Sequence, residues 1–228
     1  EADEETLIAT HLSRRPDAML LTGINHSAQS RRLLLGAGIP VVEVWDITDS
    51  PIDMCVGFDQ ADSGRGVAEF LHQQGHVRAG TITALDSRAL RRQAAFAKRF
   101  EQLSGTAVDE ANTGGPASIG AGRRALAELI DAKGFTTGAI FCSSDILAHG
   151  VLIEAGARGM AVPGDLAVMG FGDQDFARDL EPALSTVEVD RERIGVIAAE
   201  ALIGRIAGQT PETPTFDLGW QIVRRASA

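Results

Sequence analysis

The sequence predicts an α/β protein with two lobes, each a parallel β-sheet flanked by helices. Strand-like and helix-like segments alternate along the 228 residues, and several of the strand-like runs are apolar along their whole length. Such runs are typical of strands that are covered on both faces, as in parallel sheets. Apolar residues make up 44% of the chain and charged residues 23%, an ordinary composition for a globular protein that needs no disulfide or structural metal to fold.

Hydrophobic patterns place the elements in order. Apolar runs predict strands at 18–22, 41–45, 54–58, 79–83, 138–142 and 166–171. Apolar residues three and four positions apart predict core-facing helices at 60–74, 87–103 and 190–207. Glycines just past helical segments predict C-caps at Gly75, Gly134 and Gly159. The chain opens in a helical segment, whereas a doubly wound sheet usually opens with a strand, so we expect an earlier part of a longer protein to be missing.

Two extended junctions favour two sheets over one. At 57–60 a strand passes directly into a helix start, and 182–190 forms an extended run before the last long helix. No Pro/Ser-rich linker or charge run separates the halves of the chain. Each junction can therefore carry the chain from one lobe to the other.

The charge balance argues against nucleic-acid binding by this chain itself. Its 21 basic and 31 acidic residues give a net charge of −10, which repels phosphate backbones at long range. No window approaches 18 consecutive apolar residues, so we expect no membrane span. Cys55 and Cys142 lie far apart and favour two reduced, buried thiols over a disulfide. The acidic N-terminus does not resemble an export signal, which favours a cytoplasmic location.

No motif in the chain favours an enzyme. GxSxG, GxxxxGK[ST], HExxH and a complete GxGxxG are all absent from the sequence. His72 and His76 have a spacing that suits a metal on a helix, but Gly75 stands where that helix should end. An enzyme that uses Asp173 or Asp175 as a base is the weakest alternative, because no nucleophile, metal cluster or cofactor loop accompanies them. We therefore expect no cofactor and no metal.

Two arginines form the first candidate site. Arg88 and Arg92 lie four residues apart after Asp86, at a predicted helix start, so both face the same way. Two guanidinium groups on one face repel each other unless an anion joins them, and arginine suits bidentate binding of a carboxylate. The spacing alone is more typical of a solvated basic face.

Two strand ends form further candidates. The segment 172–176 follows one buried strand, and 143–145 follows another. In open α/β sheets, ligands bind beyond the carboxyl ends of the strands. The first segment offers acceptors for hydroxyl groups, although a polar turn would have the same composition. In the second, Ser144 or Asp145 could instead cap the following helix.

Six segments of the chain match the motifs of one known protein family. The segment 15–23 is similar to an RPDGIILTG strand, and 37–42 to AGIPVV. The other similar segments are 75–76, 141–150, 162–171 and 182–187. In their order and spacing these segments resemble the effector-binding domain of the lactose-repressor (LacI) family of bacterial transcription regulators. Within the family the chain most resembles gluconate-type repressors, by the segments 41–46, 56–59 and 217–219 and by the arginine pair.

The resemblance implies a periplasmic-binding-protein-like (type I) fold with a truncated N-terminal lobe. That lobe would comprise 1–58 and 190–218, and the C-terminal lobe 59–189 and 219–228. A helix-turn-helix domain that reads operator DNA would be absent from this chain. The intact protein would be a homodimeric, cytoplasmic regulator, in most cases a repressor, that releases its operator when an effector closes the lobes. A periplasmic-type sugar-binding protein of the same fold is the alternative.

The resemblance also implies which residues bind the effector. Arg92 falls on an arginine that commonly contacts it, and Arg88 lies one helical turn earlier. Gly172 and Trp45 stand where many members have an aspartate that binds hydroxyl groups, and Ser144 stands where many have asparagine. Two arginines without these acids point to a sugar acid such as gluconate. The complete set of expected effector-binding residues is Arg88, Arg92, Phe141, Ser144, Asp145, Gly172, Asp173, Gln174, Asp175, Trp45, Asp46 and Phe58.

Overall fold

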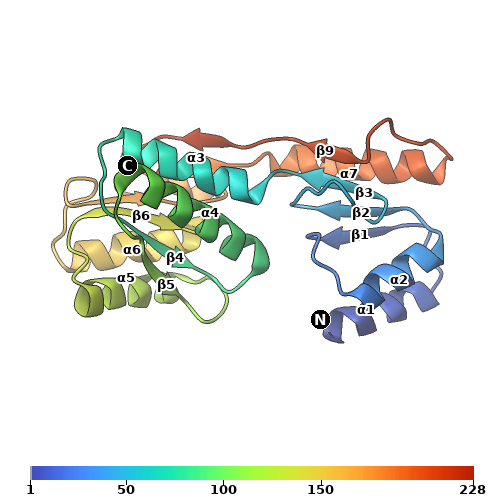
Figure 1. Ribbon diagram of the computed structural model, residues 1–228, viewed down its shortest axis with the longest axis horizontal. Helices are drawn as coiled ribbons and strands as arrows, with labels where there is room; N and C mark the ends of the chain where they lie inside the picture. Colours follow the sequence, from blue (N-terminus) through green and yellow to red (C-terminus); the bar gives the residue numbers. More distant parts are fainter. Residues whose placement is uncertain (1) are drawn as a thin grey trace. The chain divides into compact units, whose positions relative to one another are not determined.

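The computed structural model describes residues 2–228 and divides them into two compact units (Figure 1). Unit 1 contains the residues up to Asp59 together with Asp190–Gly219. Unit 2 contains Gln60–Val189 and Trp220–Ala228. The chain thus passes between the units at three points, each in an extended or turn segment.

Unit 1 is a parallel sheet with helices on both faces. Its strands hydrogen-bond in the order β1-β2-β3-β9, and every pairing is parallel. Helices α1 and α2 cover one face and α7 covers the other (Figure 1). In chain order the elements are α1 (Ala2–Ser13), β1 (Met19–Thr22), α2 (Ala28–Ala37), β2 (Val41–Val44), β3 (Met54–Gly57), α7 (Arg191–Ile206) and β9 (Thr215–Asp217).

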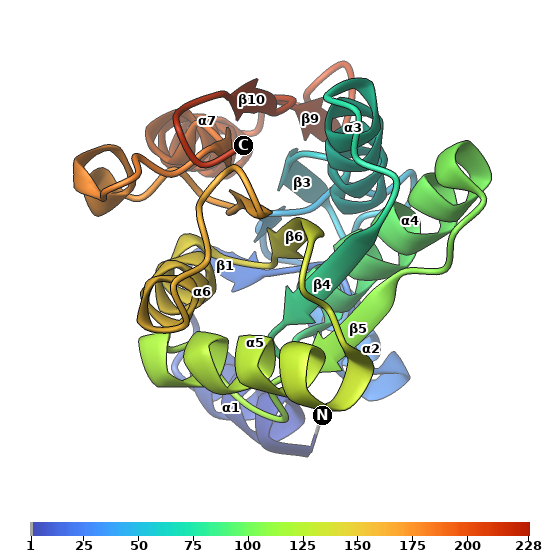
Figure 2. The ribbon, with the colours of Figure 1, turned by 90° about the vertical axis from the view of Figure 1, so that its left-hand side faces the viewer.

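Unit 2 repeats this architecture with a second parallel sheet, in the order β5-β4-β6-β7. Figure 2 shows α3 and α4 on one face of this sheet and α5 and α6 on the other. The antiparallel pair β8 and β10 lies beside them. Its elements are α3 (Gln60–Gln73), β4 (Ala79–Thr83), α4 (Ser87–Ser104), β5 (Asp109–Asn112), α5 (Ile119–Lys133), β6 (Gly138–Cys142), α6 (Asp145–Ala157), β7 (Leu166–Met169), a 3₁₀ helix η1 (Asp175–Asp179), β8 (Thr186–Glu188) and β10 (Gln221–Val223).

The predicted fold class is confirmed, and the predicted strands and long helices form within two residues of their expected ends. Gly134 caps α5 in the left-handed conformation, and Gly75 and Gly159 also have positive φ just past their helices. Both cysteines are buried and free. Between residues 2 and 228, no helix is long and apolar enough to cross a membrane.

Glycine allows the helices of unit 2 to approach very closely. A Cβ atom on Gly64 of α3 would lie 2.3 Å from the carbonyl oxygen of Arg92 in α4. On the other face of the sheet, a Cβ on Gly122 of α5 would lie 2.2 Å from the carbonyl oxygen of Leu147 in α6. Real Cβ atoms do not come this near to backbone oxygen, so a larger side chain at either position must push the helices apart.

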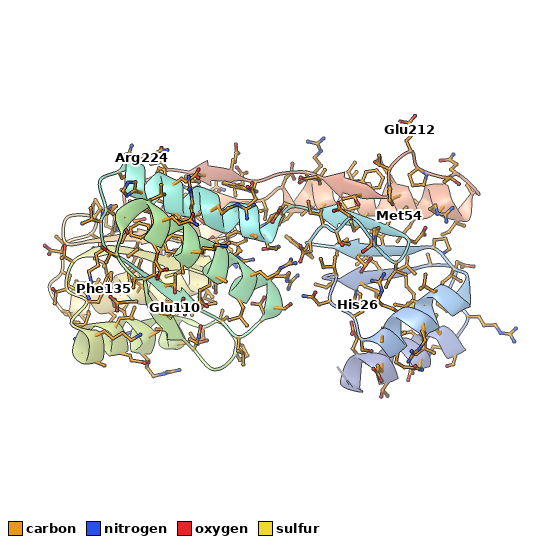
Figure 3. The ribbon with its side chains drawn as sticks, in the orientation of Figure 1. His26, Met54, Glu110, Phe135, Glu212 and Arg224 are labelled. Carbon is orange, nitrogen blue, oxygen red and sulfur yellow. The ribbon has the colours of Figure 1, made fainter. Side chains whose placement is uncertain are left out.

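His26 of unit 1, labelled in Figure 3, has an acid within reach of each ring nitrogen. Its Nδ1 lies 2.7 Å from Glu4 Oε1, and its Nε2 lies 3.1 Å from the Gly23 carbonyl oxygen and 3.3 Å from Glu43 Oε1. Every one of these neighbours is an acceptor, so either neutral tautomer would leave one ring nitrogen without a proton to donate. The hydrogen bonds with Glu43 and Glu4 raise the pKa of His26 although burial opposes them.

We predict that Gly122→Ala lowers the free energy of unfolding by about 1–3 kcal/mol, because the added methyl group overpacks the contact between α5 and α6. Gly156→Ala is the matched control, since a Cβ there meets no atom within 4 Å. The control should be neutral or more stable by up to about 1 kcal/mol, because alanine favours a helix. Urea unfolding of both variants checks this, and equal stabilities would contradict the close contact.

We predict that unit 1 loses stability as pH rises above about 6.5. A raised pKa means that the folded state keeps a proton which the unfolded state has released, so this stabilisation is complete below the unfolded pKa and disappears as pH passes the folded pKa. Each tenfold difference in proton affinity between the folded and the unfolded state corresponds to about 1.4 kcal/mol of unfolding free energy. Trp45 fluorescence in a Trp220→Phe background follows unit 1 during urea unfolding at pH 6 to 9.

His26→Gln should remove this pH dependence. His11→Gln should preserve it, because His11 is exposed on α1. The same slope in both variants would refute the assignment to His26.

Candidate functional site

Three loops meet at one edge of the unit 2 sheet. Strands β4, β6 and β7 are parallel neighbours, so the segments that follow them, 84–88, 143–145 and 170–175, lie at the same end. We call this the carboxyl-end edge of unit 2. It brings together the predicted arginines and both predicted strand-end segments.

Arg92 lies at the centre of this edge. Its side chain is nearly closed to solvent, with 6% of the residue exposed. The guanidinium donates to the side chain of Gln60 at the start of α3, and to the carbonyl oxygen of Ser143 at 3.0 Å. It also lies 3.8 Å from the ring centroid of Phe171, which follows β7. The cation is therefore held in one orientation by groups from three elements.

Arg88 differs from Arg92 although both lie on α4. Asp86 caps this helix and accepts the backbone N–H groups of Arg88 at 3.1 Å and Ala89 at 3.0 Å. The Arg88 side chain remains 30% exposed, with its Nε 3.9 Å from Asp86 Oδ1. A pair at this distance and exposure contributes little to stability. The two predicted arginines are thus one buried, fixed cation and one solvated cation.

Asp145 binds the loop that follows β7 by a hydrogen bond to its backbone. It begins α6 and is completely buried. Its Oδ1 accepts from the Thr186 hydroxyl at 2.6 Å, and its Oδ2 accepts from the Gln174 backbone N–H at 2.7 Å. Burial raises the pKa of Asp145, although these hydrogen bonds oppose the shift. Ser144 precedes it as the N-cap of α6, which is the capping role that the sequence left open.

The loop itself has an unusual backbone. Gly172 has φ +120°, a conformation that L side chains rarely adopt, and its N–H donates to the Val187 carbonyl oxygen at 2.7 Å. Asp173 also has positive φ, at 45°. Gln174 is half-buried and precedes η1, which begins at the exposed Asp175.

Phe141 lies in the core of unit 2. It belongs to β6, is 2% exposed, and packs on Phe96 of α4 with ring centroids 5.1 Å apart. Phe96 in turn stacks on Phe100. Through this contact with Phe96, the Phe141 ring packs against α4, the helix that carries Arg92.

The three predicted residues of unit 1 follow its strands β2 and β3. Trp45 is half-buried with φ +73°, and its N–H donates to the Val56 carbonyl oxygen at 3.0 Å. Asp46 is buried and accepts the Ile47 N–H at 3.0 Å. Phe58 is buried as well. These residues lie at the carboxyl ends of the unit 1 strands.

Sequence reasoning missed several residues that shape the edge of unit 2. Gln60 and Phe171 bind the Arg92 guanidinium, and Thr186 binds Asp145. Gln60 was recognisable only as the first residue of a predicted helix, and Phe171 as the last residue of a predicted strand. Arg225, which binds Asp173, lies 52 residues away in sequence, so no local pattern could have indicated it.

We predict that the stability difference between Asp145→Asn and the wild type changes with pH. An acid with a raised pKa stabilises the fold only while it is protonated, so the wild type should lose stability as pH rises from about 4 through the folded pKa. The asparagine amide is neutral and can still accept from Gln174 and donate to Thr186. Its free energy of unfolding should therefore rise relative to the wild type between pH 4 and 7.

Asp145→Ala should be less stable than Asp145→Asn by about 1–3 kcal/mol at every pH, because the Gln174 N–H is left without its acceptor. Urea unfolding at a series of pH values separates the two variants. A wild-type-to-asparagine difference that does not vary with pH would exclude the titration.

The chain matches known proteins along nearly its whole length. Residues 68–228 match the family model for a periplasmic binding protein-like domain. The HTH-type transcriptional regulator GntR of Pseudomonas aeruginosa is 36% identical over 99% of this chain, and GntR of Escherichia coli is 31% identical over 96%. The chain spans 66% of the length of each of these relatives.

Solved structures that are similar to this chain are also transcription regulators. Transcription regulator GntR from Chromobacterium violaceum has a TM-score of 0.91 at 32% identity, covering 99% of this chain and 83% of that one. A LacI family transcriptional regulator from Silicibacter pomeroyi has a TM-score of 0.89 at 31% identity, with coverages of 98% and 82%. These proteins are regulators and not enzymes, as the sequence predicted, and they decide against the periplasmic-type alternative. The chain therefore belongs to the LacI family of transcription regulators and forms their effector-binding domain, with the periplasmic binding protein-like fold.

Proposed function

We propose that this domain senses a small sugar acid, with gluconate as the reference ligand. The observation that carries the proposal is the Arg92 guanidinium, which Gln60, Ser143 and Phe171 hold at the carboxyl ends of the strands. A cation fixed in this way can bind a carboxylate without first losing side-chain freedom. The GntR relatives are consistent with the gluconate-type branch that the sequence resembles.

The residues around Arg92 differ in their exposure to solvent, and we assign them different roles. Arg88 adds a second, solvated positive charge one turn before Arg92. Ser144, Gln174 and Asp175 offer polar groups for the hydroxyls of the ligand. Because Asp145 and Phe141 are buried, we assign them the role of positioning the loop and α4.

Unit 1 contributes a second set of residues in the proposal. Trp45, Asp46 and Phe58 follow its strands, where ligands of parallel α/β sheets bind. Gly172 and Trp45 replace acids that the family often uses for neutral ligands, which also favours an anionic effector. We infer that units 1 and 2 are the two lobes of the effector domain.

In the full-length protein, the effector would change operator affinity by favouring one arrangement of the lobes. A ligand shifts such an equilibrium only by its difference in affinity between the two states. We propose that the intact protein is a cytoplasmic homodimer which reads its operator through a separate helix-turn-helix domain. The net charge of −10 fits a domain that does not itself contact DNA.

Calorimetric titration with D-gluconate and D-glucose tests the effector class, on this chain and on the full-length protein. The two ligands differ chiefly in the carboxylate, so binding of gluconate alone supports the proposal. Equal binding of glucose would show that the arginines do not select the ligand. Binding of neither ligand by the full-length protein would exclude gluconate as the effector.

We predict that Arg92→Gln weakens D-gluconate binding by about 1.5–3 kcal/mol, the usual value of a charged hydrogen bond. Lys98→Gln is the matched control, because it removes the same charge from an exposed position of α4. The control should bind gluconate as the wild type does. Thermal unfolding of both variants establishes that the folded domain is being titrated, and equal affinities of folded Arg92→Gln and Lys98→Gln would refute the role of Arg92.

A further inference from the structure

Arg225, near the C-terminus, binds the loop that follows β7 through an ion pair with Asp173. Arg225 Nη1 lies 2.7 Å from Asp173 Oδ1, and Arg225 Nη2 lies 3.0 Å from Asp173 Oδ2. Nη1 also donates to the Leu184 carbonyl oxygen at 2.9 Å. The two side chains are only 18% and 14% exposed. This is a bidentate, largely buried ion pair, and hydrogen bonding to Asp173 raises the pKa of Arg225.

The backbone around Arg225 is held by hydrogen bonds that do not involve Asp173. The Arg225 N–H donates to the Ser185 hydroxyl at 2.8 Å. The buried Ser227 hydroxyl donates to the Val168 carbonyl oxygen in β7 at 2.7 Å and accepts from the Ser185 N–H at 2.8 Å. The C-terminal segment is therefore anchored to β7 and to the residues that precede β8, and Arg225 is preorganised for its partner.

The ion pair is a second anchor of the loop, in addition to Asp145. Asp145 binds the Gln174 N–H, and Arg225 binds the carboxylate of Asp173, the residue just before it. Asp173 has the left-handed φ of 45°, so the pair also stabilises a backbone conformation that aspartate adopts infrequently.

The pair also changes the charge of the carboxyl-end edge. Asp173 lies two residues after Phe171, whose ring covers the Arg92 guanidinium. A carboxylate at this loop that lacks a counter-ion repels an anionic ligand and accepts hydrogen bonds from the hydroxyls of a neutral one. With Arg225 bound to both of its oxygens, Asp173 contributes little net negative charge.

We propose that Arg225 is a positioning residue that sets the charge selectivity of the effector site. By ordering the loop and neutralising Asp173, it makes the site prefer an anionic sugar acid over a neutral sugar. This inference rests on the proposed function, since it concerns selectivity at the same site.

The test compares the affinities for D-gluconate and D-glucose in four proteins: wild type, Arg225→Gln, Arg224→Gln, and the double variant Arg225→Gln with Asp173→Asn. Arg224 is the matched control, because it is the preceding residue and is exposed (Figure 3). Arg225→Gln should lower the preference for gluconate by about tenfold, the effect of one partly screened charge at the edge of a site. The double variant should recover most of the preference, and Arg224→Gln should keep it.

A loss of both affinities by the same factor in Arg225→Gln would show a purely structural role and overturn the selectivity claim. An unchanged preference in that variant would overturn it too. Arg225→Lys retains the charge and should restore most of the preference. Failure of this rescue, together with failure of the double variant, would exclude an electrostatic cause.

Hydrogen exchange of residues 170–176 without ligand separates this inference from the proposed function. Arg225→Gln should raise the exchange rates of this loop at least tenfold over Arg224→Gln. Equal rates would overturn the positioning role whatever the ligand is. A wild-type protein that shows no preference for gluconate would instead overturn the proposed function and the selectivity claim with it, while the exchange rates still decide the positioning role.

Discussion

The close contact between α3 and α4 at Gly64 determines where the key cation lies. Because Gly64 has no side chain, the backbone of Arg92 can pack directly against α3. Gln60, one turn earlier on α3, then reaches the Arg92 guanidinium. The same approach leaves the cation in reach of Ser143 and of Phe171, which close the shell around it. The absence of a side chain at Gly64 of α3 thus allows the contacts that fix the Arg92 guanidinium at the carboxyl end of the unit 2 sheet.

Around this cation, three neighbouring acids each have a structural partner. Asp86 caps α4, Asp145 is buried under the loop after β7, and Asp173 binds Arg225. These contacts reduce the negative charge that the three acids contribute near Arg92, although the whole chain has a net charge of −10. Local pairing and burial, and not overall composition, decide which ligand charge such an edge favours.

The parts of the fold that are apolar and regular were predictable from sequence. For strands β4 and β6 the predicted and the observed ends are the same, because both strands are covered on both faces and are therefore mostly apolar. Strand β5 was missed, since Asp109–Asn112 is polar and lies at the sheet edge, where burial imposes no pattern. In the candidate site, Arg92 could be named from its spacing and family resemblance. Its burial and the pairing of Asp173 with Arg225 depend on contacts between distant segments, which no local pattern encodes.

Gly172 also restricts how the regulator can change over evolution. An aspartate at this position would adopt φ +120°, at a cost of about 1–3 kcal/mol, and would place a second carboxylate beside Asp145, whose Oδ2 lies 3.8 Å from the position of its Cβ. An acid at this position therefore comes with backbone strain and with repulsion from a neighbouring carboxylate. A change of ligand class through this one position would need compensating changes in the backbone of the loop.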